Sequence, residues 1–66
     1  MAVAYIEPAD GGWTLKLGDD EQRFATASGA IFQGIELARG LVTVEREVWV
    51  LWRNGDAWSV AWTSSE

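Results

Sequence analysis

Apolar and polar residues alternate along the start of the chain with the two-residue period of β-strands. Residues 1–7 are predicted to form one strand and residues 13–17 a second, with alternate side chains on one face. Proline and glycine residues within segment 8–12 predict a turn between them, because proline presets one backbone angle and glycine supplies positive φ. Gly18 begins another turn, and a short third strand is expected over residues 21–25.

The period changes to that of a helix after Thr26, which is a suitable N-cap for a helix over about residues 27–39. The apolar stripe consists of Ala27, Ile31, Ile35 and Ala38, flanked by Ala30, Gly34 and Leu37. Gly34 is predicted to let the helix backbone approach bulky sheet side chains, and Phe32 lies off the stripe. Gly40 suits the C′ position just beyond the helix.

The last third of the chain has the strongest strand pattern. Residues 42–53 are rich in β-branched and aromatic residues, and Asn54-Gly55 is the preferred type I′ hairpin turn before a returning strand over residues 56–63. The predicted element order is β-β-(β)-α-β-β. We therefore expect a single α+β domain over residues 1–66, with an antiparallel sheet of four to five strands and one helix packed on one face.

An Asn54-Gly55 loop would fix which side chains share a face of this hairpin, because directly opposite residues lie on the same side. One face then carries Val48, Val50, Trp52, Ala57, Ser59 and Ala61. The other carries Glu47, Trp49, Leu51, Trp58, Val60 and Trp62. The helix is expected to cover the first face, because a carboxylate such as that of Glu47 is rarely buried alone.

Both faces of the predicted hairpin are apolar, and one helix covers only one of them. Trp49, Trp58 and Trp62 are then expected to form an exposed cluster, which predicts an interface with a second copy or with another protein. Two alternatives are open: the helix covers the tryptophan face, or the tryptophans pack against loops as a second core. Edge pairing by the N-terminal strand is a further route to association.

Composition excludes most catalytic chemistry. The 66 residues include no cysteine and no histidine, which removes disulfides, the usual zinc sites, and Ser-His or Cys-His catalysis. Glu45 and Glu47 would share a strand face, but no nucleophile or phosphate-binding loop accompanies them. The sequence predicts a non-catalytic protein without metal or cofactor. A core this small also favours association with a partner.

The charge balance disfavours nucleic acid as the direct partner. Five basic residues against ten acidic ones give a net charge of −5, which gains nothing from counterion release on phosphates. Exposed aromatic side chains could stack RNA bases, but only Lys16 and Arg46 are near. The apolar start lacks a basic flank and is too short to cross a membrane, so we expect no signal peptide and a soluble, cytoplasmic protein.

The same acidity suggests an alternative function. The chain could be a small acidic inhibitor of a nucleoprotein complex, of the kind that mobile elements encode, anti-CRISPR proteins among them. Carboxylates would stand in for phosphates against a basic groove, with binding that weakens steeply in salt. The candidate acidic surface consists of Glu7, Asp10, Asp19, Asp20 and Glu21.

Three short motifs follow one another along the chain: Asp10-Gly11-Gly12-Trp13 between two strands, Phe24-Ala25-Thr26 before a helix with Ala30 and Leu37-Ala38-Arg39, and Val48 to Gly55. In this order they resemble the bacterial domain-of-unknown-function family 2188, over about residues 3–60. The segment Ile6 to Trp13 is also similar to the start of HicB-type antitoxins, which place a small β-β-β-α domain against a toxin. Both resemblances imply the α+β fold, and neither implies a catalytic residue.

Overall fold

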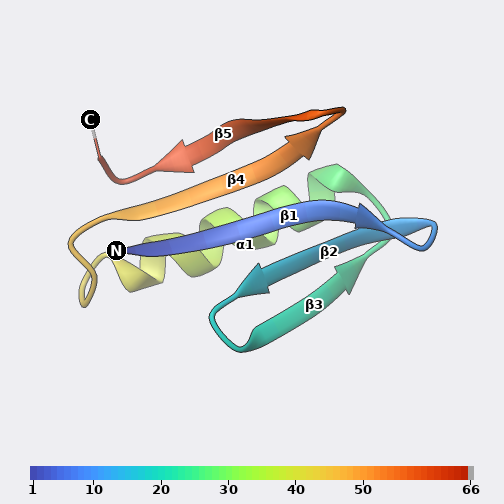
Figure 1. Ribbon diagram of the computed structural model, residues 1–66. Coiled ribbons are helices and arrows are strands. Elements are labelled where there is room, and N and C mark those ends of the chain that lie inside the picture. Colours follow the sequence, from blue (N-terminus) through green and yellow to red (C-terminus); the bar gives the residue numbers. More distant parts are fainter. Residues whose placement is uncertain (66) are drawn as a thin grey trace.

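The computed structural model describes residues 1–65, which fold into a five-stranded sheet with one helix against one face (Figure 1). The elements are β1 (Ala2–Ala9), β2 (Gly12–Leu17), β3 (Asp20–Phe24), α1 (Ala27–Leu41), β4 (Val48–Asn54) and β5 (Ala57–Thr63). The sheet order is β3-β2-β1-β4-β5. The predicted α+β class, with one helix packed on one sheet face, is confirmed.

The first three strands form a meander joined by two-residue loops. Ala9 pairs with Gly12 across a loop of Asp10 and Gly11, whose φ angles of 45° and 81° are those that a type I′ turn requires. The predicted turn over residues 8–12 is therefore shorter than expected, and β1 continues through Pro8. Aspartate and glycine accept the left-handed region at low cost, so the turn is encoded locally.

The prediction of a wholly antiparallel sheet is wrong, because β1 and β4 run parallel. Helix α1 carries the chain back along the sheet, so β4 starts at the same end as β3 and runs in the same direction. Since β3 and β1 are both antiparallel to β2, β4 is also parallel to β1. Strand β1 thus has partners on both sides and is not an edge, which removes it as a route to edge pairing.

The core lies between α1 and the strands β1, β2 and β4, in the layer behind the sheet in Figure 1. Its fully buried residues are Ala4, Ile6, Leu15, Ala30, Ala38, Val48 and Val50. Gly34 sits over this layer: a Cβ there would lie 3.2 Å from Ile6 Cδ1 and 3.3 Å from Val50 Cγ1. The predicted role of Gly34 in close helix–sheet packing is confirmed.

Helix α1 starts where expected but ends later. Thr26 Oγ1 accepts a hydrogen bond from the Gly29 amide at 3.1 Å, as an N-cap residue does. At the other end, α1 continues to Leu41, so Gly40 lies in the last helical turn rather than beyond it. Residues 42–47, predicted as the start of a strand, form a turn and an irregular connection, with the Val44 and Glu45 amides both donating to the Leu41 carbonyl.

Replacing Thr26 with alanine is expected to lower the free energy of unfolding by about 1 kcal/mol, because the Gly29 amide loses its acceptor. Urea denaturation followed by tryptophan fluorescence measures this change. Ser28→Ala is the matched control, since Ser28 is exposed in the same helical turn. Equal midpoints for the two variants would contradict an energetic role for the cap.

Candidate functional site

The β4–β5 hairpin has a different register from the one predicted, but mostly the predicted faces. Asn54 pairs with Ala57, so the loop consists of Gly55 and Asp56 and lies one residue later than expected. Gly55 has φ of 67° at the first loop position, where type II′ turns take glycine. Moving the loop by one residue changes the register by two, and a two-residue shift keeps each side chain on its own face.

A β-bulge then moves Trp62 away from the face on which it was expected. Leu51 pairs with Val60, but Val50 pairs with Trp62, which leaves Ala61 as the extra residue. Trp62 therefore lies on the helix side and packs against the core. Glu47 and Trp62 therefore do not share a face as expected, and Thr63 lies opposite Trp49.

The tryptophans divide between the two faces of the sheet. Trp13, Trp52 and Trp62 pack against the core on the helix side, where the rings of Trp13 and Trp52 lie 6.4 Å apart. Trp49 and Trp58 lie on the helix-free face, which we call the open face. Of the three tryptophans expected on this face, only these two lie there, and Tyr5 from the central strand contacts Trp58.

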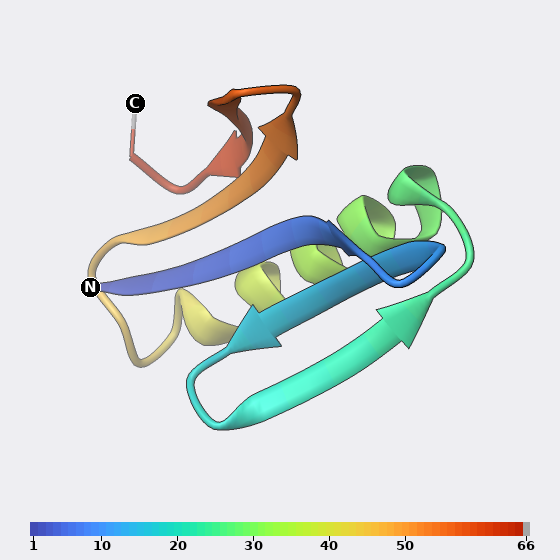
Figure 2. The same ribbon diagram turned by 45° about the vertical axis from the view of Figure 1, so that its right-hand side comes forward.

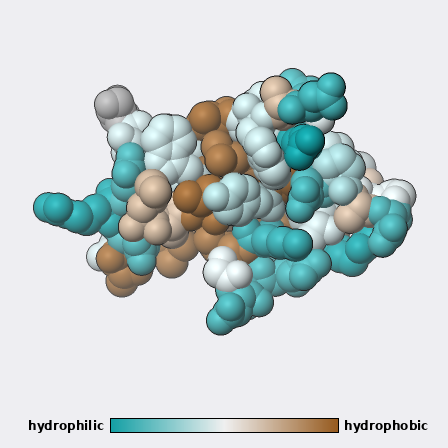
Figure 3. Space-filling model, in the orientation of Figure 1, coloured by the Kyte–Doolittle hydropathy of each residue, from teal (hydrophilic) through white to brown (hydrophobic). Residues whose placement is uncertain are grey.

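The open face carries an apolar region over β1, β4 and β5, which we call the aromatic patch. Its members share this face by strand register: Val3, Tyr5, Trp49, Leu51, Trp58 and Val60. Tyr5, Trp58 and Val60 are 44%, 41% and 53% exposed, whereas the other three are half-buried. Figure 3, which views this face, has brown apolar side chains over the middle of the sheet and hydrophilic ones toward the rim.

Two contacts hold the Trp58 ring in place. The Tyr5 ring meets it edge-on, with centroids 5.6 Å apart and planes at 76°. The Arg53 guanidinium lies 5.5 Å from the Trp58 ring centroid, and Arg53 Nε donates to the Gly55 carbonyl at 3.1 Å. An exposed indole is therefore fixed by neighbours on two strands.

The other half of the open face is polar and carries both signs of charge. Lys16 faces Glu21 across β2 and β3, and Thr14 faces Arg23. The Arg23 guanidinium reaches over β2 to the Ala9 carbonyl at 3.0 Å. Thr14 is buried on this face, with only 2% exposure.

Glu47, the remaining member of the predicted interface, lies just before β4 and is half-buried. Its carbonyl accepts a hydrogen bond from the Ala2 amide at 2.9 Å, which ties the connection after α1 to the start of β1. The structure thus brings together Trp49, Leu51, Trp58 and Val60 of the predicted set. It places Trp62 on the opposite face and Glu47 outside the strands.

The candidate acidic surface does not form one patch. Asp10 lies in the β1–β2 turn, close to Glu7 in β1, while Asp19, Asp20 and Glu21 lie in and after the β2–β3 turn. These turns are at opposite ends of β2, about 20 Å apart for a strand of this length. That distance exceeds the Debye length of about 8 Å at physiological ionic strength, so the two groups act separately.

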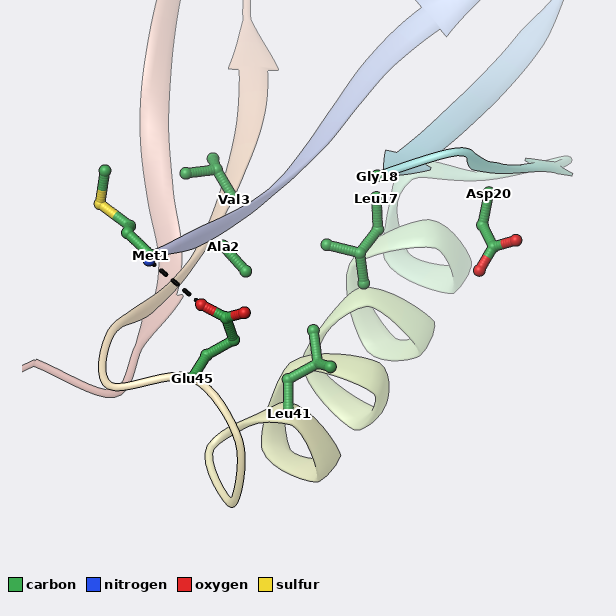
Figure 4. A pocket seen from close by; sticks show the side chains of 8 residues that line it. All are labelled: Met1, Ala2, Val3, Leu17, Gly18, Asp20, Leu41 and Glu45. Atoms are coloured by element: carbon green, nitrogen blue, oxygen red, sulfur yellow. Dashed lines mark ion pairs between the residues drawn. The ribbon is translucent and has the colours of Figure 1, made fainter.

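A cleft of about 450 Å³ lies at the end of the sheet where β1 begins (Figure 4). Its lining comes from the start of β1, the β2–β3 turn and the end of α1, and includes Leu17 and Leu41. The Met1 ammonium forms an ion pair with Glu45 Oε1 at 3.1 Å beside it. This cleft meets the aromatic patch at Val3, which belongs to both.

Within residues 1–65, no group of three or more acidic side chains is placed to hold a metal ion. In the same described part of the chain, α1 is too short and too polar to cross a membrane. Comparisons with protein-family models, curated proteins and solved structures find no match to this chain. The two family resemblances seen in the sequence stay predictions.

Tyr5, Val3 and Arg53 belong to the site but were not predicted for it. Tyr5 and Val3 face Leu51 and Trp49 only because β1 and β4 are parallel neighbours, a pairing that no local pattern indicates. Arg53 could have been assigned from alternation along its strand, which places it on the same face as Trp49 and Leu51.

Proposed function

We propose that this chain is a non-catalytic protein-interaction module that binds protein through the aromatic patch. The single observation that carries the proposal is an apolar surface, drawn from three neighbouring strands, on a sheet face that no other element within residues 1–65 covers. Monomeric proteins seldom expose contiguous apolar surface without a binding role. Tryptophan, tyrosine and arginine are also the residues most enriched at binding hot spots.

The contacts of the Trp58 ring support this function further. Ordering a free side chain at an interface costs about 0.5–1.5 kcal/mol, which subtracts from affinity. Trp58 is already held between Tyr5 and the Arg53 guanidinium, so little of this cost remains for it. A preordered indole at 41% exposure is suited to fill a partner's pocket.

The charges of the open face favour protein over nucleic acid as the partner. Lys16 faces Glu21, Arg23 is bound to the Ala9 carbonyl, and Arg53 lies over Trp58. Arg23 and Arg53 are therefore already engaged, and Lys16 beside Glu21 does not by itself form a track for a phosphate backbone. The division of the acidic residues between two ends of β2 likewise gives no continuous phosphate mimic, so the inhibitor alternative has no specific support.

Selection of random displayed peptides on the immobilised chain tests the proposal without a known partner. We expect the enriched peptides to compete with one another for one site. Their affinity should fall at least about tenfold for the Trp58→Ser variant, because the exposed indole of the patch is lost. Binding constants are measured by titration calorimetry or surface plasmon resonance.

Phe32→Ser is the matched control, because Phe32 is a more exposed aromatic residue, at 65%, on the helix side of the molecule. Its peptide affinities should equal those of the unmodified chain. Circular dichroism verifies that both variants are folded. Peptides that lose affinity for Phe32→Ser but keep it for Trp58→Ser would place the binding surface on the helix and overturn the proposal.

A further inference from the structure

The two edges of the sheet differ sharply in charge. Edge strand β3 has the sequence Asp-Glu-Gln-Arg-Phe, with three charged residues, whereas edge strand β5 has the sequence Ala-Trp-Ser-Val-Ala-Trp-Thr and carries none. Charged side chains are a common means of preventing an edge strand from pairing with another chain. Strand β3 is protected in this way, and β5 is not.

The free backbone groups of β5 can be assigned from the hairpin geometry. Asn54 and Ala57 flank the two-residue loop, so they form a hydrogen-bonded pair, and Trp52 and Ser59 form the next one. The amides and carbonyls of Trp58 and Val60 then point away from β4, toward the open edge. Hydrogen-bonding groups are thus available at two alternate residues.

Strand β5 is also the strand that α1 covers least. In Figures 1 and 2 it lies at the rim of the sheet, beyond the helix. The aromatic patch reaches this rim, because Trp58 and Val60 are both members of the patch and both more than two-fifths exposed. An added strand at β5 would therefore continue the patch as well as the hydrogen-bond ladder.

We infer that the β5 edge pairs antiparallel with the β5 edge of a second copy, about a two-fold axis at Ser59. This inference rests on the proposed function and names the partner. In that register Trp58 of each copy lies opposite Val60 of the other copy. The outward amides and carbonyls of these residues then form hydrogen bonds between the two strands. Each Trp58–Val60 contact is an aromatic–β-branched pair on the open face, a combination that stabilises antiparallel strands.

The features around this axis are self-complementary. Ser59 lies opposite itself on the helix side, where its small side chain leaves room for its copy. The bulge at Ala61 ends the regular segment of β5 directly after Val60, so the pairing uses the residues before it. The edges that remain after pairing are the two charged β3 strands, which closes the assembly at two copies.

The negative charge of the chain does not oppose this pairing. Asp56, the acidic residue next to β5, is three residues from Ser59, which puts the two copies of Asp56 about 20 Å apart along the antiparallel pair. That is about two and a half Debye lengths at physiological ionic strength. Asp20 and Glu21 lie on the opposite edge of each copy and face away. The charges thus leave β5 as the edge at which a second copy can approach.

Sedimentation equilibrium and light scattering over a wide concentration range test the inference. A contact this short buries less than the roughly 1,200 Å² of a stable complex, so the apparent mass should rise gradually with concentration from 7.3 kDa toward twice that value. Val60→Pro removes one outward amide at a position where an edge strand tolerates proline. We expect this variant to stay at 7.3 kDa at concentrations where the unmodified chain is mostly dimeric.

Two matched variants separate the backbone effect from others. Val60→Ala keeps the backbone amide and should still dimerise. Glu21→Pro removes an outward-pointing amide from the other edge strand, β3, and should leave dimerisation unchanged. If circular dichroism finds Val60→Pro unfolded, Val60→Lys replaces it, because it brings two like charges together beside the axis. The inference would be overturned if the folded disrupting variant, Val60→Pro or its replacement Val60→Lys, associated as strongly as the unmodified chain.

The remaining outcomes separate this inference from the proposed function. If the unmodified chain stays at 7.3 kDa while selected peptides still require Trp58, the second copy is the wrong partner and the interaction module stands. If the chain dimerises and Trp58→Ser prevents it while Val60→Pro does not, the faces meet rather than the edges. Selected peptides that bind without Trp58, together with a monomeric chain, would overturn both proposals.

Discussion

Replacing Ile6 with alanine is expected to remove most of the stability of this chain. Ile6 is completely buried in the central strand, below Gly34 of the helix and beside Leu15 and Trp52 of the neighbouring strands. Truncating such a side chain costs about 2–5 kcal/mol, because apolar burial is lost and a cavity is left. A domain of this length is stable by only about 3–10 kcal/mol, so we expect partial or complete unfolding in buffer.

Urea denaturation followed by circular dichroism and tryptophan fluorescence measures this loss. Ile6→Val is the graded comparison and should cost about 0.5–1.5 kcal/mol, since it removes a single methylene group. Phe32→Ala, which truncates an exposed residue of α1, should change the midpoint little. An Ile6→Ala variant whose midpoint matches that of Phe32→Ala would show that the core around β1 is not packed as described.

Replacing Gly34 with valine is expected to be the second most damaging change. Even a single Cβ at this position lies within 3.5 Å of Ile6, Val50 and Leu15, all of which are fully buried. Valine adds two further methyl groups where there is no space, so α1 must move away from the sheet. Overpacking of this kind costs about 1–3 kcal/mol or more.

A second glycine in the same helix provides the control for Gly34. Gly40 has no atom within 4 Å of its Cβ position, so Gly40→Ala should gain up to about 1 kcal/mol from helix propensity alone. Gly34→Ala receives the same gain but must displace Ile6 and Val50, so it should be less stable than Gly40→Ala. Chemical denaturation of both variants measures the difference. A Gly34→Val midpoint at or above that of the unmodified chain would show that α1 can shift freely.

The elements of this fold follow from local sequence, and the arrangement of the sheet does not. Turn residues and alternation identify β1, β2 and the last hairpin, and Thr26 identifies the start of α1. Parallel pairing of β1 with β4 depends on residues more than forty positions apart, where no turn fixes the register. The alternation of apolar and polar residues in β1 fits an antiparallel neighbour as well as a parallel one. The sequence therefore predicted hairpins and missed the parallel pair.

The candidate site was predictable up to the point where the hairpin becomes irregular. Alternation alone places Leu51, Trp58 and Val60 on one face, and an error of two in the register leaves that assignment intact. One extra residue, Ala61, reverses every side chain after it, so Trp62 was assigned to the wrong face. Nothing in the sequence around Ala61 indicates a bulge, since neither glycine nor proline is present there.

The parallel neighbour of β1 also determines when this protein can fold during its synthesis. Residues 2–6 take half of their ladder partners from residues 48–52, so the middle of the sheet joins two segments that are synthesised more than forty residues apart. A growing chain that stops before β4 has the β1–β2–β3 meander and the helix, but one side of β1 has no partner and Val48 and Val50 are missing from the core. Contacts of such long sequence separation form slowly, because a large loop must close first. We therefore expect this fold to form only after β4 has left the ribosome.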